Sequence, residues 1–241
     1  MLHAYGLDVP RTLEEICDPK RVALLVYDMQ VGVLRQIKNA AEITAAVVRV
    51  LHAARVAGIR VVFTRHLSLP KELMGVFQLR MALAWQRVET VEEVSPWFLR
   101  DSPGFQLIPE LEPLPTEAVF DKITMSAFEG TPLNLVLRDC GINAVAVVGV
   151  AMEVGIEPTV RHAADLGYIP VIVRDACGAG HEEAAQRSIA CVDYSGDAVL
   201  TDVSTIRGVF SSLAVNADAS TVAGASRGSA QASNATSRYK L

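Results

Sequence analysis

Short runs of apolar residues recur along the chain, and they restrict its fold more than any other feature of the sequence. The clearest runs cover residues 22–27, 59–64, 144–150 and 169–173, and a shorter pair covers residues 118–120 and 198–200. Runs of this length with few polar residues are typical of strands buried on both faces of a sheet. We therefore expect these strands to lie inside the protein.

Helical patterns separate these runs. Residues 40–57 carry apolar side chains at helical spacing, and Gly58 follows as a helix stop. Similar patterns cover residues 131–139, 158–166 and 181–192. Strands that alternate with helices are joined by right-handed crossovers, which produce a parallel sheet with helices on both faces. The sequence therefore predicts an α/β fold.

The order of these elements also predicts where a functional site lies. In open parallel sheets, ligands bind outside the carboxyl ends of the strands. Asp28, Arg65 and Lys122 each follow an apolar run, and residues 151–157 follow the most apolar one. We expect these groups to meet at one edge of the sheet.

The composition favours one folded domain followed by a polar tail. Hydrophobic residues make up 51% and charged residues 20% of the 241 residues, which suits a sizeable core. From residue 211 the chain is rich in Ser, Ala, Gly and Asn and lacks apolar periodicity. We expect a domain over residues 1–210 and a flexible tail over residues 211–241.

Charge and cysteine content restrict the partners and the compartment. The formal net charge of -5 offers no basic footprint for nucleic acid. No apolar run approaches the roughly 20 residues that span a bilayer, and the first residues lack a signal-peptide pattern. The cysteines are widely spaced, which fits a reduced cytosol. We expect a cytoplasmic protein that acts on a small molecule, with no nucleic-acid or membrane partner.

Asp28 and Lys122 each have an ordinary and a functional interpretation. Asp28 either caps the following helix or acts as a general acid or base at the end of a strand. Lys122 is either a surface charge or a buried partner, and its apolar neighbours Val119, Phe120 and Ile123 favour burial. A buried ammonium and a buried carboxylate need one another.

A third segment follows the most apolar run. Residues 149–159 read Gly-Val-Ala-Met-Glu-Val-Gly-Ile-Glu-Pro-Thr and open a helix. Backbone amides at the start of a helix favour negative charge, so the segment is a candidate oxyanion site. The alternative is an ordinary strand-to-helix turn in which glycine permits tight geometry.

Taken together, the three segments resemble one family. Tyr-Asp-Met-Gln around Asp28, Lys-Ile-Thr-Met-Ser-Ala-Phe from Lys122 and the segment 149–159 match the order and spacing of isochorismatase-like hydrolases of the cysteine hydrolase superfamily. The resemblance covers residues 20–202. It implies a Rossmann-like three-layer α/β/α fold with a six-stranded, mostly parallel sheet, and a cis peptide between Val150 and Ala151. It also implies an Asp, Lys and Cys triad, in which Asp28 and Lys122 fill the first two places.

Gly155 stands where the resemblance implies the nucleophilic cysteine. Glycine has no side chain, so a covalent thioester route is closed at that position. Cys177, after the next strand, is better explained as a small buried hydrophobe. Isochorismatases proper resemble this chain in having glycine there, and they hydrolyse a vinyl ether without a protein nucleophile. An engineered replacement of cysteine is the alternative.

The remaining site residues follow from the same segments. Asp28, Lys122 and Gly155 are the predicted catalytic positions. Predicted substrate contacts are Gln30, Arg65, His66, Phe128, Ala151, Met152 and Glu153. Glu153 either activates water directly or is a solvated or helix-capping acid. No Asp-x-His pattern accompanies His66, so we expect neither a metal nor a cofactor.

The sequence leaves three functions open. The first is a cofactor-free hydrolase of a small molecule through Asp28 and Lys122, with an anionic substrate as one option and vinyl ether cleavage as one version. An acid role for Asp28 requires a raised proton affinity, which Lys122 would oppose. The second is an amidase or ureidase in which Asp28 or Glu153 drives water onto a carbonyl. The third is a non-catalytic binding protein on the same fold.

Residues 73–99 predict either a lid or a contact between subunits. The segment contains more large apolar side chains than a surface lid should expose. They are Leu73, Met74, Val76, Phe77, Leu79, Trp85, Trp97 and Phe98. We expect a homo-oligomer, either a dimer or a tetramer.

Overall fold

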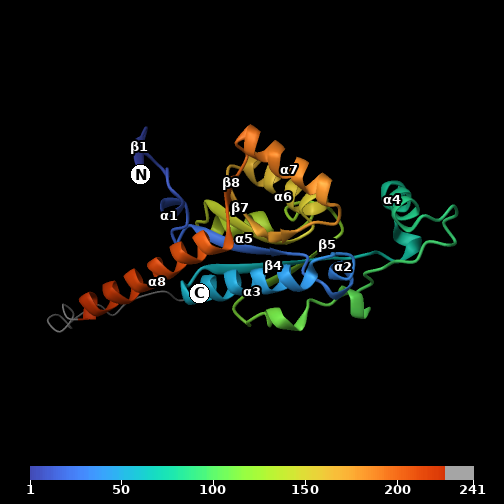
Figure 1. The fold of residues 1–241 in the computed structure, drawn as a ribbon, viewed down its shortest axis with the longest axis horizontal. Helices are drawn as coiled ribbons and strands as arrows, with labels where there is room; N and C mark the ends of the chain where they lie inside the picture. The colour runs from blue at the N-terminus through green and yellow to red at the C-terminus, as the bar shows by residue number, and fades with distance from the viewer. Residues whose placement is uncertain (226–241) are drawn as a thin grey trace, which may run out of the picture.

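A six-stranded, fully parallel sheet forms the centre of the protein (Figure 1). The computed structural model describes the backbone of residues 1–225 and the side chains of residues 1–214. The strand order is β5-β4-β3-β6-β7-β8. The strands are β3 (Val22–Tyr27), β4 (Arg60–His66), β5 (Ala118–Lys122), β6 (Ala144–Val150), β7 (Ile169–Gly178) and β8 (Val199–Thr201). Each predicted run forms a strand, and the predicted sheet is confirmed.

Helices cover both faces of this sheet. In Figure 1, α3 (Ala40–Val56) and α8 (Val203–Ala225) lie on one face. On the other face lie α5 (Leu133–Asp139), α6 (Glu157–Asp165) and α7 (Glu182–Ser195). Two four-residue helices, α1 (Leu13–Ile16) and α2 (Val31–Leu34), flank β3 along the chain. The arrangement is the predicted three-layer α/β/α fold.

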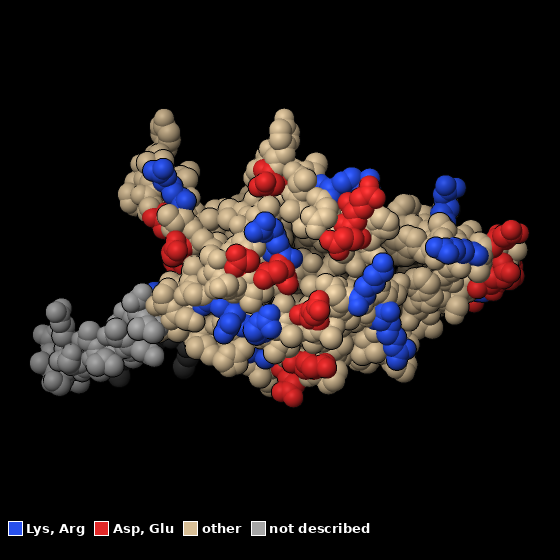
Figure 2. All heavy atoms as spheres, in the orientation of Figure 1, with Lys and Arg blue, Asp and Glu red and all other residues tan. Residues whose placement is uncertain are grey.

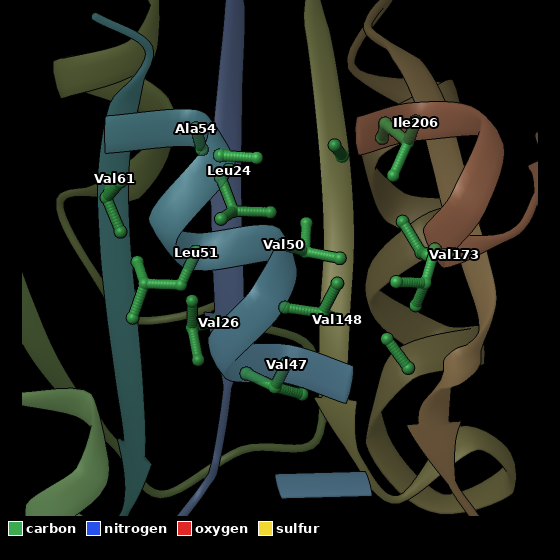
Figure 3. Packing of buried hydrophobic residues seen from close by; sticks show 14 of the residues in the cluster. Leu24, Val26, Val47, Val50, Leu51, Ala54, Val61, Val148, Val173 and Ile206 are labelled. Atoms are coloured by element: carbon green, nitrogen blue, oxygen red, sulfur yellow. The ribbon is translucent and has the colours of Figure 1, made fainter. Parts of the chain in front are cut away.

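Strand residues alternate between two cores because successive side chains point to opposite faces of a sheet. Leu24 and Val26 of β3 belong to the core beneath α3 and α8, whereas Leu25 belongs to the core beneath α5 and α6. Figure 3 shows Val50 and Leu51 of α3 packed above β3. Every residue of β3 and β6 is buried, which explains why both read as continuous apolar runs.

A long excursion separates β4 from β5. It contains α4 (Val76–Gln86) and the short turns η1 (Lys71–Leu73), η2 (Pro103–Phe105) and η3 (Pro109–Leu111). We call residues 67–102 the arm. Helix α4 has no buried residue and stands apart from the sheet in Figure 1. Val76 and Phe77 are 79% and 69% exposed. The homo-oligomer stays a prediction.

Some elements have no counterpart in the predictions. Strands β1 (Leu2–Ala4) and β2 (Leu7–Val9) form a short antiparallel hairpin. Helix α8 continues through residues 211–225, where a flexible tail was expected. Those residues contain no proline and several alanines, and alanine is the best helix former. The rest of the expected tail, residues 226–241, lies outside the described residues.

The described surface mixes charges of both signs. Figure 2 shows Lys and Arg interspersed with Asp and Glu on one face, without an extended basic area among its described residues. Within residues 1–225, no helix combines the length and apolar character that crossing a membrane requires.

Candidate active site

Asp28 and Lys122 form a buried ion pair at the carboxyl edge of the sheet. Lys122 Nζ donates to Asp28 Oδ2 across 2.6 Å, and Thr64 Oγ1 of β4 donates to Asp28 Oδ1 across 2.7 Å. Asp28 and Lys122 are 5% and 3% exposed. Burial lowers the pKa of Lys122, and the Asp28 charge opposes that shift. Of the two interpretations of Lys122, the buried partner is confirmed.

The sheet topology brings the pair together. Strand β4 lies between β3 and β5, so Lys122 reaches from β5 past Thr64 to the residue that follows β3. Asp28 has a φ of 47°, a left-handed conformation that Asp tolerates better than most residues. Gln30 is the N-cap residue of α2. The helix-capping interpretation of Asp28 is therefore wrong.

The Tyr27 ring fills the space beside Gly155. A Cβ built on Gly155 would lie 2.5 Å from Cε1 and Cζ of Tyr27 and closer still to its hydroxyl oxygen. The hydroxyl donates to the Met125 carbonyl, and Lys122 Nζ lies 4.3 Å from the ring centroid. Burial and the Asp28 charge raise the pKa of Tyr27, so the phenol stays protonated. Residue 155 must be glycine while Tyr27 keeps this position.

A tight turn joins β6 to α6. The Val150–Ala151 peptide is cis, as the family resemblance implied. Residues Met152–Ile156 then form a π-helical turn, in which the N–H groups of Val154 and Gly155 donate to the Ala151 carbonyl. The preceding N–H groups have no acceptor within the turn, as at any helix start.

A cavity of about 300 Å³ is lined by residues of this turn and by Tyr27 and Asp28. Its polar lining comes from Tyr27, Asp28, Gln36, His66 and Glu153, among the residues that the structure describes. Its apolar lining includes Val33, Ile37, Val150, Val154, Met125 and three aromatic residues of the arm, Trp85, Trp97 and Phe98. The arm therefore covers the cavity, which is one of the two roles predicted for residues 73–99.

Glu153 places a carboxylate at the rim of the turn. Its Oε1 accepts from the backbone N–H of His181 across 2.6 Å. Its Oε2 is buried and has no hydrogen-bond partner. A buried acceptor without a partner is uncommon in native proteins and needs an explanation. Glu153 is also among the residues that line the cavity, but Oε2 itself has almost no surface open to that space.

His66 is a neutral group in this lining. Burial and the nearby Lys122 charge lower its pKa from 6.5 to about 4. Its ring meets Phe98 edge to face, with the centroids 6.0 Å apart. At neutral pH the imidazole therefore adds no positive charge to the cavity.

Four of the predicted contacts lie outside the cavity lining. Gln30 is fully buried, and its amide bonds the backbone of His66 and Phe105. Arg65 points to the other side of β4 from His66, because side chains alternate along a strand, and pairs with Asp121 across 2.8 Å. Phe128 stacks on Tyr168 in the core, and Met152 is fully buried beside it. The other predicted contacts, His66, Ala151 and Glu153, line the cavity.

Several site residues were missed by the sequence patterns. Thr64 and Tyr27 belong to apolar runs, which predict a place in a strand and nothing more. The pattern of residues 73–99 marks Trp85 and Trp97 only as large apolar residues of the arm. Their aromatic character was a usable signal, because ligand cavities are commonly lined by aromatic side chains.

No cysteine lies in the cavity lining among the described residues. Cys17 is buried, and burial raises its pKa to about 12. Cys177 lies in β7, where burial also raises its pKa. Cys191 is exposed on α7. The buried thiols lack the low pKa of a reactive cysteine.

Comparison with known proteins identifies the family. The model of the Isochorismatase domain matches residues 22–204. The chain belongs to this family. The match begins at β3 and ends just after β8, so it contains the whole central sheet and every cavity-lining residue named above.

Individual relatives are distant. The ureidoacrylate amidohydrolases RutB of Pantoea ananatis and Serratia proteamaculans are each 27% identical, over 70% of this chain and 74% and 75% of their own lengths. A cysteine hydrolase structure from Pseudomonas syringae pv. phaseolicola superposes with a TM-score of 0.71 at 23% identity, covering 82% of this chain and 96% of its own. N-carbamoylsarcosine amidase from Thermoplasma acidophilum superposes with a TM-score of 0.61 at 22% identity, covering 76% and 96%. The family match and the amidohydrolase relatives identify the chain as a hydrolase.

Proposed function

We propose that this protein hydrolyses the C–N bond of a small, uncharged amide or ureide, with water rather than a cysteine as the nucleophile. One observation carries the proposal. The Asp28 carboxylate lines the cavity next to Gly155, while the Tyr27 ring occupies the space that a side chain at position 155 would need. A carboxylate with no neighbouring thiol suits activation of water.

Asp28 acts as the base in this proposal. It takes a proton from water as the oxygen attacks the carbonyl carbon, and the carbonyl becomes a tetrahedral oxyanion. Asp28 then returns the proton to the leaving nitrogen as the C–N bond breaks, which yields an acid and an amine or ammonia. Lys122 and Thr64 hold the carboxylate in place through their hydrogen bonds. The unpaired N–H groups at the start of the 152–156 turn suit the oxyanion.

The charge of the cavity favours an uncharged substrate over an anionic one. Its described lining contains Asp28, whose charge the ion pair with Lys122 balances, and the Glu153 carboxylate, but no Lys or Arg, and His66 is neutral. Isochorismate carries two carboxylates and would meet no unpaired cation in this lining. Vinyl ether cleavage is therefore the weaker version of the hydrolase hypothesis.

Other observations support the amide reaction. The RutB relatives are named as amidohydrolases, and one structural neighbour as an amidase. The buried Oε2 of Glu153 has no partner, and a small rotation of the side chain toward the cavity would let it accept an N–H of an amide or ureide. We assign Glu153 to substrate binding and Asp28 to proton transfer. A non-catalytic binding role is disfavoured because Asp28 lines the cavity.

Turnover of a small panel tests the proposal. Purified wild type and Asp28→Asn are assayed against primary amides, ureides and isochorismate. We expect wild type to hydrolyse members of the first two classes, and Asp28→Asn to be at least about a hundredfold slower. Equal turnover by both proteins would remove the role of Asp28. Activity confined to isochorismate would restore the vinyl ether reaction.

A further inference from the structure

A second cavity of about 280 Å³ adjoins the first. Residues that line both are His66, Trp85, Trp97, Phe98 and Met125, so these side chains lie between the two spaces. The second cavity extends outward under α4 and away from Asp28, which does not line it. The two spaces therefore have a reactive inner part and an outer part with no acid or base from the proposed reaction.

The outer cavity has the lining of an apolar binding site. Met74, Phe77, Met81 and Ala82 line it together with the shared aromatic residues. Among its described lining residues there is no Asp, Glu, Lys or Arg. Apolar and aromatic lining with few polar groups is typical of a site that binds an uncharged ligand by burial.

We propose that the outer cavity binds an apolar tail of the substrate, preferably an aromatic ring, while the amide head lies beside Asp28 and Glu153. This inference rests on the proposed function, since it extends the same substrate beyond the reacting bond. The shared wall carries it, because the two cavities lie against the same side chains, including Trp85 and Trp97, so a substrate that extends past them reaches from one space into the other. An aromatic ring also packs favourably edge to face or offset against these side chains.

A matched pair of amides tests the tail. 3-Phenylpropionamide and propionamide have the same reacting group and differ only in the phenyl ring. We expect wild type to show a kcat/KM about a hundredfold higher for the phenyl compound. Equal kcat/KM values for the two amides would overturn the proposal.

A matched pair of variants tests the cavity. Ala82 lines the outer cavity, whereas Ala84 on the same helix is exposed and does not line it. Ala82→Phe fills the cavity and should lower kcat/KM for 3-phenylpropionamide at least about tenfold. It should leave kcat/KM for propionamide unchanged, and Ala84→Phe should change neither value. Unchanged selectivity in Ala82→Phe would overturn the proposal.

Binding separates this inference from the proposed function. Trp85 and Trp97 are the chain's two tryptophans, and both line both cavities, so their fluorescence reports occupancy directly. If no amide is hydrolysed, the proposed function fails, yet 3-phenylpropionamide should still quench wild type at a concentration at least about tenfold lower than it quenches Ala82→Phe. Analytical sedimentation of wild type and Ala82→Phe measures the oligomeric state of each protein. A change of oligomeric state in Ala82→Phe with unchanged ligand binding would overturn the inference and assign the cavity to a subunit interface.

Discussion

Tyr27 and Gly155 compete for one volume, since any Cβ at position 155 would overlap the Tyr27 phenol. These residues lie on neighbouring segments, Tyr27 at the end of β3 and Gly155 in the turn after β6. The absence of a side chain at position 155 is therefore tied to the presence of a large one at position 27.

This overlap predicts a coupled effect on stability. Gly155→Ala should lower the free energy of unfolding by about 1–3 kcal/mol, because the tyrosine ring must move. The double variant Tyr27→Val, Gly155→Ala should lose at least about 1 kcal/mol less free energy of unfolding than the two single variants lose together. Urea unfolding measures all three variants. Gly208→Ala, at an exposed site of α8 with no atom within 4 Å of the added Cβ, is the control. Simple additivity would mean that the two residues do not share this space.

Breaking the buried ion pair of Asp28 and Lys122 should lower the free energy of unfolding more than Gly155→Ala does. Asp28→Asn keeps a residue that tolerates the left-handed backbone but leaves Lys122 without a counter-charge. We expect about 3–5 kcal/mol of destabilisation, and partial recovery in Asp28→Asn combined with Lys122→Met. Urea unfolding at pH 7 provides the comparison. A double variant no more stable than Asp28→Asn would show that the stranded ammonium is not the cause.

His66 predicts a loss of stability in mild acid. Its pKa is about 4 in the folded protein against 6.5 for a free histidine, so the unfolded chain binds the proton more tightly. This contribution is complete above pH 6.5 and is lost as the pH falls toward 4. Between pH 7 and 4.5, wild type should lose about 2–3 kcal/mol more than His66→Gln in urea unfolding. Parallel losses in the two proteins would show that His66 titrates normally.

If Glu153 binds the substrate, its replacement should change KM much more than kcat. If its Oε2 accepts an N–H of the substrate, Glu153→Gln should raise KM about tenfold and change kcat less than about threefold. Glu129→Gln, at an exposed position, is the matched control for loss of a carboxylate. A collapse of kcat at constant KM would instead identify Glu153 as the group that activates water.

The positions of the thiols predict that enzymatic activity survives alkylation. Cys191 is exposed, whereas burial raises the pKa of Cys17 and Cys177. Iodoacetamide at neutral pH should modify Cys191 before either buried thiol, with turnover of the best amide retained. Mass spectrometry with activity measured on the same sample checks this order, and Cys191→Ser is the control. Inactivation that tracks modification of Cys177 would contradict a water nucleophile.

Strand positions were predictable because a strand that is buried on both faces appears in the sequence as a continuous apolar run. The run 144–150 became β6, and its neighbour 22–27 became β3. The pairing of Asp28 with Lys122 followed from their places at the carboxyl ends of parallel strands, Asp28 just after β3 and Lys122 as the last residue of β5. Helix α4 had no such pattern, since it buries no residue and so has no apolar stripe facing a core.

Side-chain direction was harder to predict than strand position. Arg65 and His66 are adjacent in sequence, yet only His66 lines the cavity. Gln30 follows Asp28 closely but is buried, with its amide bonded to the backbone of His66 in β4 and Phe105 in η2. The overlap of Tyr27 with position 155 involves residues that are 128 positions apart (155 − 27), and no local pattern reports such a contact.

The arm leaves the sheet after β4 and the chain returns at β5, where His66 and Lys122 sit side by side in the ladder. The reacting groups are thus held by paired strands, while the aromatic walls belong to an inserted segment outside the sheet. Under the proposed function, the groups that react and the walls that hold the substrate's tail are therefore encoded in separable stretches of sequence. Replacing residues 67–102 with another arm offers a route to new substrate tails on an unchanged reaction centre.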